Sequence, residues 1–111
     1  MSKYGNRRVT LDGYAFDSLA ESRRYQELCL LLAAGAICQL EVHPRYELIP
    51  KFKDSTGKSH RAIVYEGDFA YLEERKVVVE DVKGHEVPVW KLKQKLFLYK
   101  YPEIELRVIR A

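Results

Sequence analysis

The sequence lacks several features that mark common classes of protein. No apolar run approaches the roughly 20 residues that a membrane-spanning helix needs. The residues after Met1 are polar, so they do not form the apolar core of a secretion signal. No internal repeat, low-complexity tract or linker interrupts the 111 residues. We therefore expect a single cytoplasmic domain over residues 1–111, with no membrane partner.

Cysteine is also scarce. The chain has two, Cys29 and Cys38, and no pattern of metal ligands surrounds either of them. Both lie in or beside an apolar helical segment, which predicts reduced, packed thiols rather than a disulfide framework.

A strong excess of charge of one sign is missing as well. The 19 basic and 16 acidic residues leave a net charge of +3. This mild excess permits a nucleic-acid partner without requiring one, so the distribution of the charge matters more. Residues 1–8 contain Arg7 and Arg8, and two interpretations stay open here: a frayed tail, or a flexible basic arm that contacts DNA phosphates.

The hydrophobic content of 47% is typical of a globular chain, and its first clear element is a helix. Ser18 and Glu21 form the capping-box pattern that begins a helix. Glu21 also starts a stripe, continued by Tyr25, Leu28 and Leu32, that is expected to face inward. It is therefore either a capping residue alone or a carboxylate aimed at the edge of a sheet. The other charged residues of this helix are expected on its other faces: Arg23, Arg24 and Glu27.

Three segments predict consecutive strands. Arg45–Phe52 alternates, Ala62–Leu72 is rich in β-branched and aromatic residues, and Lys76–Lys83 is built on a Val-Val-Val run. The polar segment 53–61 between the first two predicts a turn. Strands that are adjacent in the sequence most simply form an antiparallel meander.

The last two of these strands carry polar residues at unusual positions. A two-residue turn at Glu73-Glu74 would place Asp68 diagonally across from Asp81 on one face of the hairpin. Asp81 and Lys83 share that face because side chains alternate along a strand. In this register the hairpin predicts two carboxylates beside an ammonium group, able to converge on one cation.

A second helix is predicted over Val89–Tyr99, after Pro88, which suits the first helical position. Its inward stripe is expected to contain Val89, Leu92, Leu96 and Tyr99. The lysines off that stripe are predicted to be exposed and to contact DNA phosphate: Lys91, Lys93 and Lys95.

A final strand over Ile104–Ile109 completes the pattern. A helix between two strands allows the last strand to lie parallel to the one before it. The order helix, three strands, helix, strand predicts an α/β fold with one mixed sheet flanked by helices.

This element order, together with Asp68 and Asp81-Val82-Lys83, resembles the PD-(D/E)XK nuclease superfamily. That superfamily shares an αβββαβ, restriction-endonuclease-like core with an acid on the second strand and (D/E)-x-K on the third. The nearest resemblance is to small phage- and prophage-encoded endonucleases similar to Holliday junction resolvases. Four segments carry it, in order: Phe16–Tyr25, Leu40–Pro44, Gly67–Phe69 and Glu80–Gly84. Gly67 stands where the superfamily's name has a proline.

The resemblance implies roles for single residues. Asp68 and Asp81 would bind Mg²⁺, for which Mn²⁺ can substitute, because hard carboxylate oxygens suit these ions. The Val82 carbonyl and Glu21 would contribute to the metal shell. Lys83 would be the catalytic lysine that orients the attacking water and stabilises negative charge.

The implied function is a Mg²⁺-dependent endonuclease that hydrolyses phosphodiester bonds in branched or structured DNA such as Holliday junctions. A four-way junction presents symmetric strands, so a homodimer with two sites would suit it. Two alternatives stay open: another phage nuclease of the same fold (nicking, packaging or restriction-type), and a non-catalytic DNA-binding module. Asp81 and Lys83 alone would fit a solvated strand end with a weak ion pair. Glu80 is left out of the site because alternation directs it to the opposite face.

Overall fold

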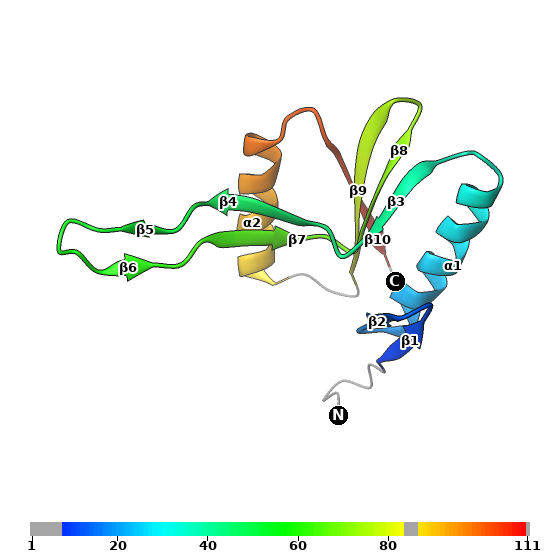
Figure 1. The fold of residues 1–111 in the computed structure, drawn as a ribbon, viewed down its shortest axis with the longest axis horizontal. Coiled ribbons are helices and arrows are strands. Elements are labelled where there is room, and N and C mark those ends of the chain that lie inside the picture. Colours follow the sequence, from blue (N-terminus) through cyan, green and yellow to red (C-terminus); the bar gives the residue numbers. More distant parts are fainter. Residues whose placement is uncertain (1–7, 84–86, 111) are drawn as a thin grey trace.

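The centre of the protein is a mixed four-stranded sheet with a helix on each face (Figure 1). The computed structural model describes residues 8–83 and 87–110. The strand order is β10-β9-β8-β3, with β8 antiparallel to both neighbours and β10 parallel to β9. The predicted α/β class, with its parallel last strand, is confirmed. The elements of this unit are α1 (Leu19–Ala33), β3 (Cys38–Val42), β8 (Phe69–Glu73), β9 (Lys76–Lys83), α2 (Pro88–Lys100) and β10 (Glu105–Arg110).

A short hairpin, β1 (Val9–Leu11) and β2 (Tyr14–Phe16), leads into α1. The Ser18 hydroxyl accepts a hydrogen bond from the Glu21 N–H, so the predicted cap is correct. Tyr25 and Leu28 of α1 are buried against the sheet as predicted, but Leu32 is 41% exposed because the last turn of α1 extends past the core. Of the cysteines, Cys29 is half-buried while Cys38 is exposed, so the prediction of a packed thiol is wrong for Cys38.

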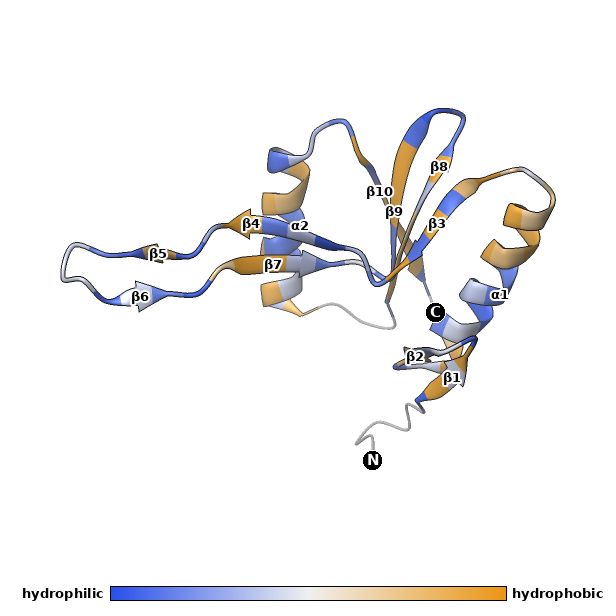
Figure 2. Cartoon of the chain, viewed as in Figure 1, coloured by the Kyte–Doolittle hydropathy of each residue, from blue (hydrophilic) through white to orange (hydrophobic). Residues whose placement is uncertain are grey.

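Alternation along β9 separates two neighbouring acids, as the sequence predicts. Glu80 lies on the α1 face, fully buried, where the Arg24 guanidinium donates to both of its oxygens at 2.8 and 2.7 Å. The Tyr71 hydroxyl also donates to Glu80. Arg24 therefore does not decorate a free face of α1, because it neutralises a carboxylate inside the fold. The hydrophobic part of β9 is the run Val77–Val79 with Val82, and charged residues occupy the rest of the strand (Figure 2).

The predicted meander is wrong in one respect, because its first strand and the first part of its second strand leave the sheet. Residues 45–66 form a long two-stranded ribbon that projects from the body (Figure 1). We call it the β4–β7 ribbon. Its strands are β4 (Arg45–Ile49), β5 (Phe52–Lys53), β6 (Ser59–His60) and β7 (Ile63–Glu66). The first strand of the sheet is instead β3, which pairs with β8.

The predicted strand Ala62–Leu72 breaks in two at Gly67-Asp68, and a close approach of the backbone explains why. The Gly67 N–H donates to the Pro44 carbonyl at 3.0 Å. A Cβ at this position would lie 2.8 Å from Val79 Cγ1, so any residue other than glycine would force Val79 or the backbone to shift. A proline here would both clash and lose the hydrogen bond, which accounts for glycine before Asp68.

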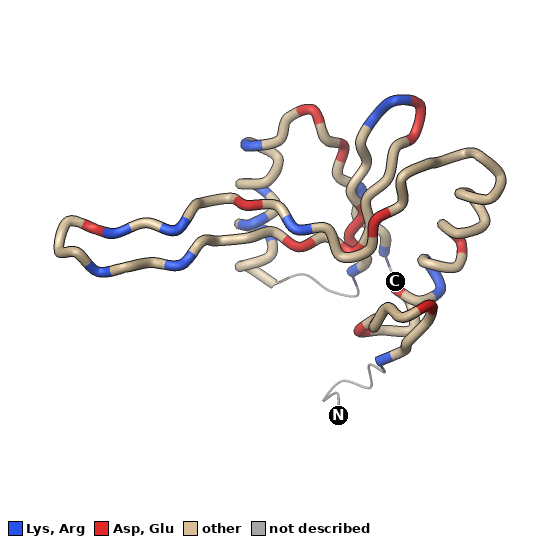
Figure 3. Tube along the Cα trace, viewed as in Figure 1, with Lys and Arg blue, Asp and Glu red and all other residues tan. Residues whose placement is uncertain are grey.

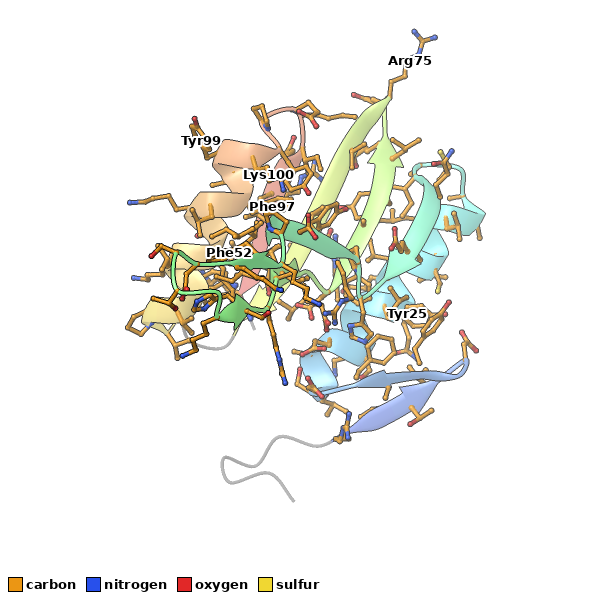
Figure 4. The ribbon with its side chains drawn as sticks, turned by 60° about the vertical axis from the view of Figure 1, so that its left-hand side comes forward. Tyr25, Phe52, Arg75, Phe97, Tyr99 and Lys100 are labelled. Carbon is orange, nitrogen blue, oxygen red and sulfur yellow. The ribbon has the colours of Figure 1, made fainter. Side chains whose placement is uncertain are left out.

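The inward face of α2 also differs from the prediction. Trp90 and Phe97 are buried, whereas Val89, Leu92 and Tyr99 are 60%, 58% and 86% exposed. The reason is the ribbon: α2 packs against β4 and β7 as well as the sheet, which rotates its buried stripe. Figure 4 shows Phe97 between α2 and the ribbon, with Tyr99 pointing away. No helix within the described part of the chain is long and apolar enough to cross a membrane.

The pair of Arg24 and Glu80 generates a stability prediction. Arg24→Met leaves the Glu80 carboxylate buried without its charged partner, and we expect it to lower the free energy of unfolding by roughly 3–5 kcal/mol in urea denaturation. Arg24→Met with Glu80→Met removes both charges and should recover most of that loss. The matched control is Arg23→Met at the exposed neighbouring position, which should stay within about 0.5 kcal/mol of wild type. Equal losses from Arg23→Met and Arg24→Met would contradict the assigned role.

Candidate functional site

The turn between β8 and β9 sets the register of the predicted acidic residues. Glu73 pairs with Lys76, and the turn residues Glu74 and Arg75 have φ of 50° and 68°. The turn thus lies one residue later than the predicted Glu73-Glu74. Relative to the prediction, each β8 residue pairs with a β9 residue two positions further along. Because side chains alternate with period two, every side chain stays on its predicted face. Phe69 pairs with Glu80 and the Asp68 N–H donates to the Glu80 carbonyl at 2.9 Å, which brings Asp68 level with Asp81 rather than diagonal to it.

Asp68 is held by hydrogen bonds from two directions. Its side-chain Oδ2 accepts from the Val82 N–H at 2.6 Å. Its carbonyl accepts from the His43 N–H at 2.9 Å, so the end of β3 is tied to the same point. The carboxylate is therefore fixed on the sheet at the break between β7 and β8.

Asp81 is almost fully buried on the α2 face and is held by neutral donors. The Trp90 indole N–H donates to its Oδ2 at 2.7 Å, and the Tyr65 hydroxyl donates to the same oxygen. Burial and the bond to Asp81 raise the pKa of Tyr65, which keeps it a donor. The second oxygen, Oδ1, lies 3.2 Å from Lys83 Nζ. Both tyrosine and tryptophan were missing from the residues that the sequence singled out for the site.

The Lys83 ammonium lies between the buried Asp81 carboxylate and solvent. Besides Asp81 Oδ1, its Nζ lies over the Trp90 ring, 5.1 Å from the centroid. The side chain is 30% exposed, so the charge is anchored on one side and open to solvent on the other. An approaching anion could contact the Lys83 ammonium while the ion pair with Asp81 stays in place.

Glu21 reaches the same region from α1. It is buried, and its Oε1 has no hydrogen-bond partner among the described residues. Burial raises the pKa of Glu21 and the nearby charge of Asp17 adds to the effect, while His43 and Lys83 oppose it. These interactions place Glu21 within electrostatic reach of Lys83, although it comes from the opposite face of the sheet. Asp68, Asp81 and Lys83 therefore lie together at one end of the sheet, and Glu21 is near enough to affect the pKa of Asp68.

The negative charge around Asp68 is not fully compensated by nearby positive charge. Burial, together with the charge of Glu21 and smaller contributions from Asp81, raises the pKa of Asp68 to about 8. A carboxyl group with this pKa sits in an environment that disfavours further negative charge. Within residues 8–83 and 87–110, no set of three or more His, Cys, Asp or Glu side chains is arranged to hold a metal ion. The arrangement offers a smaller set, two adjacent carboxylates with a lysine beside them.

A cleft of about 340 Å³ opens beside Asp81, between the β4–β7 ribbon and α2. Tyr65 and Trp90, which donate hydrogen bonds to Asp81, line two of its walls. Lys93 brings positive charge to it, while the charge of Arg45 is paired with Glu66, with Nη1 and Oε2 3.0 Å apart. The remaining lining residues are Val64 and Val89.

The predicted DNA-contacting residues have mixed outcomes. Lys91 and Lys95 are exposed on α2, while Lys93 is half-buried in the wall of the cleft rather than exposed. Arg8 is exposed and lies 3.6 Å from Asp17, which partly offsets its charge. Arg7 lies outside the described residues.

His43, which the sequence left without a role, lies beside the site. Its backbone has φ of 55°, its N–H bonds Asp68, and its ring contacts the Ala15 carbonyl at 3.0 Å. A left-handed conformation at a non-glycine residue is uncommon and marks the sharp passage from β3 into the ribbon. A His-Pro pair in the sequence indicates the break but not this contact.

The family model described as "Protein of unknown function (DUF1064)" matches residues 1–111. The chain therefore belongs to this family. No curated protein and no solved structure matches it.

The raised pKa of Asp68 generates a prediction for the protein in EDTA. Between pH 3.8, the ordinary value of the carboxyl, and about 8, the folded state keeps a proton that the unfolded chain has released. Stability should therefore fall as pH rises from 5 to 8, by at most about 1.4 kcal/mol per pH unit for this proton.

Asp68→Asn is the matched variant, because its amide oxygen can still accept from Val82. Urea denaturation at several pH values should give a flatter curve for the variant than for wild type. Parallel curves would contradict the pKa assigned to Asp68.

Proposed function

We propose that this member of the DUF1064 family is a metal-dependent endodeoxyribonuclease that hydrolyses phosphodiester bonds in branched or structured DNA. The observation that carries the proposal is the meeting of Asp68, Asp81 and Lys83 at one end of the sheet, beside a cleft that Lys93 lines. The order of the sheet unit, α1-β3-β8-β9-α2-β10, agrees with the αβββαβ core that the PD-(D/E)XK resemblance implies. Within that core, Asp68 stands at the start of the second strand and Asp81 and Lys83 at the end of the third.

The residues present fit a hard divalent cation. The raised pKa of Asp68 and the unpartnered Oε1 of buried Glu21 both indicate negative charge without enough compensation. Mg²⁺ usually binds through one or two carboxylates, water and substrate phosphate, rather than through a full protein cage. Asp68 and Asp81 would hold it with the Val82 carbonyl, Glu21 would complete the shell directly or through water, and Mn²⁺ would substitute. When bound there, the ion supplies charge that offsets the growing negative charge on the phosphate and favours ionisation of water.

The protein's own groups orient this chemistry. Val82 donates to Oδ2 of Asp68, and Tyr65 and Trp90 donate to Oδ2 of Asp81, so the Oδ1 atom of each acid is outside these hydrogen bonds. The Lys83 ammonium lies 3.2 Å from Asp81 Oδ1. A fixed cation at that position can hold the attacking water or stabilise charge on a phosphate oxygen.

The electrostatic surroundings favour an anionic polymer. Lys93 in the cleft, with Lys91 and Lys95 on α2, would offset the repulsion between the carboxylates and DNA phosphate. A four-way junction is the substrate that the resemblance suggests, and a homodimer would supply two sites for its symmetric strands. Sedimentation of the free protein and of its complex with a junction tests whether the protein is a homodimer.

Cleavage of a labelled four-way junction in Mg²⁺ tests the proposal. We expect wild type to cut, and Asp81→Asn and Lys83→Met each to reduce the rate by roughly 10²-fold or more, because each removes a charge that acts in the transition state. Matched controls are Glu103→Gln, in the loop between α2 and β10, and Lys100→Met, at the end of α2; both residues are exposed and both variants should keep the wild-type rate. Flap, single-stranded and duplex substrates in parallel separate a junction enzyme from a nicking or restriction-type nuclease.

Two results would count against the proposal. Unchanged cutting by both Asp81→Asn and Lys83→Met would remove the assigned site. Salt-sensitive DNA binding without metal-dependent cutting would favour the non-catalytic binding module instead.

Metal binding can be measured without DNA. A ligand that binds only the folded state at one hundred times its Kd stabilises that state by about 2.7 kcal/mol. We expect Mg²⁺ or Mn²⁺ to raise the Tm of wild type relative to EDTA, and Asp68→Asn to abolish the increase. Glu73→Gln, at the far end of the same hairpin, is the control and should respond like wild type. A rise in Tm that survives Asp68→Asn would place the cation elsewhere.

A further inference from the structure

The tip of the β4–β7 ribbon carries a disproportionate share of the positive charge. Residues 50–62 contain four of the 19 basic residues and one of the 16 acidic residues. Fifteen of each sign remain in the rest of the chain, so these thirteen positions account for the whole net charge of +3. Figure 3 shows the basic positions along both strands of the ribbon. They are Lys51, Lys53, Lys58 and Arg61, and all four are exposed.

The one acid of the tip is used internally. Asp54 accepts from the Thr56 N–H and hydroxyl, from the Lys58 N–H, and contacts the His60 ring at 2.8 Å. These bonds lower the pKa of Asp54 to about 2 and direct its charge into the turn. The basic side chains therefore define the outward potential of the tip.

The tip also has internal contacts of its own. The Phe52 and His60 rings stack across the two strands with centroids 4.9 Å apart, and Asp54 closes the turn between them. A free two-stranded ribbon is only marginally stable, so these contacts are what hold its shape. A preordered basic element loses less conformational entropy when it binds.

The base of the ribbon is part of the proposed site. Tyr65 of β7 bonds Asp81, and Gly67-Asp68 follows directly on β7. At about 3.3 Å per residue, Arg61 lies roughly 20 Å along the strand from that base. This reach corresponds to roughly six base pairs of duplex. A two-stranded ribbon has the width that the DNA major groove admits.

We propose that the β4–β7 ribbon lies along duplex DNA next to the cleaved strand, with Lys51, Lys53 and Arg61 as phosphate contacts. The inference rests on the proposed function and specifies its substrate as one with a duplex arm of at least roughly six base pairs beside the cut. Phosphate contacts of this kind position the substrate without reading its sequence.

The test is the salt dependence of binding, measured by fluorescence anisotropy on a labelled four-way junction in EDTA. The test variant is Lys53→Ser with Arg61→Ser. The control is Arg23→Ser with Arg75→Ser, which removes the same charge from α1 and from the β8–β9 turn, where Arg75 points into solvent (Figure 4). All four residues are exposed, and circular dichroism verifies that both variants fold.

Each phosphate contact contributes roughly 0.9 to the slope of log K against log salt. The ribbon variant should therefore lower the slope by roughly 2 and weaken binding roughly 30- to 100-fold at 0.1 M salt, while the control keeps the wild-type values. Hydroxyl-radical footprints should lose protection about six nucleotides from the cut in the ribbon variant alone. Equal weakening of the two variants would overturn the inference.

Binding and cutting separate the two proposals. Wild type that binds with the expected slope but does not cut would sink the nuclease and leave the ribbon contact standing. Wild type that cuts, with a ribbon variant that binds like the control, would sink the ribbon contact alone. Ribbon-dependent binding of polyglutamate, with DNA binding unchanged, would assign the ribbon to an acidic protein instead.

Discussion

The site depends on the way the chain is tied down at Gly67-Asp68. There the ribbon ends, the sheet begins, and hydrogen bonds to Pro44, Glu80 and Val82 fix the backbone and one carboxylate oxygen. The absence of a side chain at Gly67 permits the close approach to Val79 that makes these bonds possible. Without that approach, Asp68 would continue a strand and would not face Asp81 from a defined position.

Glu80 and Asp81, neighbours on β9, show how hydrogen-bond and ion-pair partners decide whether a carboxylate is structural or available to a ligand. Glu80 receives a guanidinium, so its charge is compensated within the fold. Asp81 receives a phenol and an indole, which are neutral donors, and shares only the Lys83 ammonium. A carboxylate held by neutral donors keeps more of its charge available to a further cation. This difference, rather than position in the sequence, separates a structural acid from a candidate ligand.

Sequence patterns predicted which face Asp68 and Asp81 share better than they predicted the fold around these residues. The common face of Asp68 and Asp81 was predictable because alternation survives a shift of the turn by one residue. The ribbon was not, because Ala62–Leu72 has the composition of one strand and its break depends on a tertiary contact with Val79. The buried stripe of α2 was mispredicted for the same reason, since the unpredicted ribbon provides part of the surface that Phe97 packs against.

The most direct test of the central claim is where a divalent cation binds. In ¹H–¹⁵N spectra with substoichiometric Mn²⁺, paramagnetic broadening should affect the amides of Phe69, Val82 and Lys83 first. Amides at the ribbon tip, such as Gly57, should remain sharp. Selective broadening at those three positions is the result the account predicts. Broadening centred on the exposed acidic turn at Glu74, or none that is selective, would contradict it.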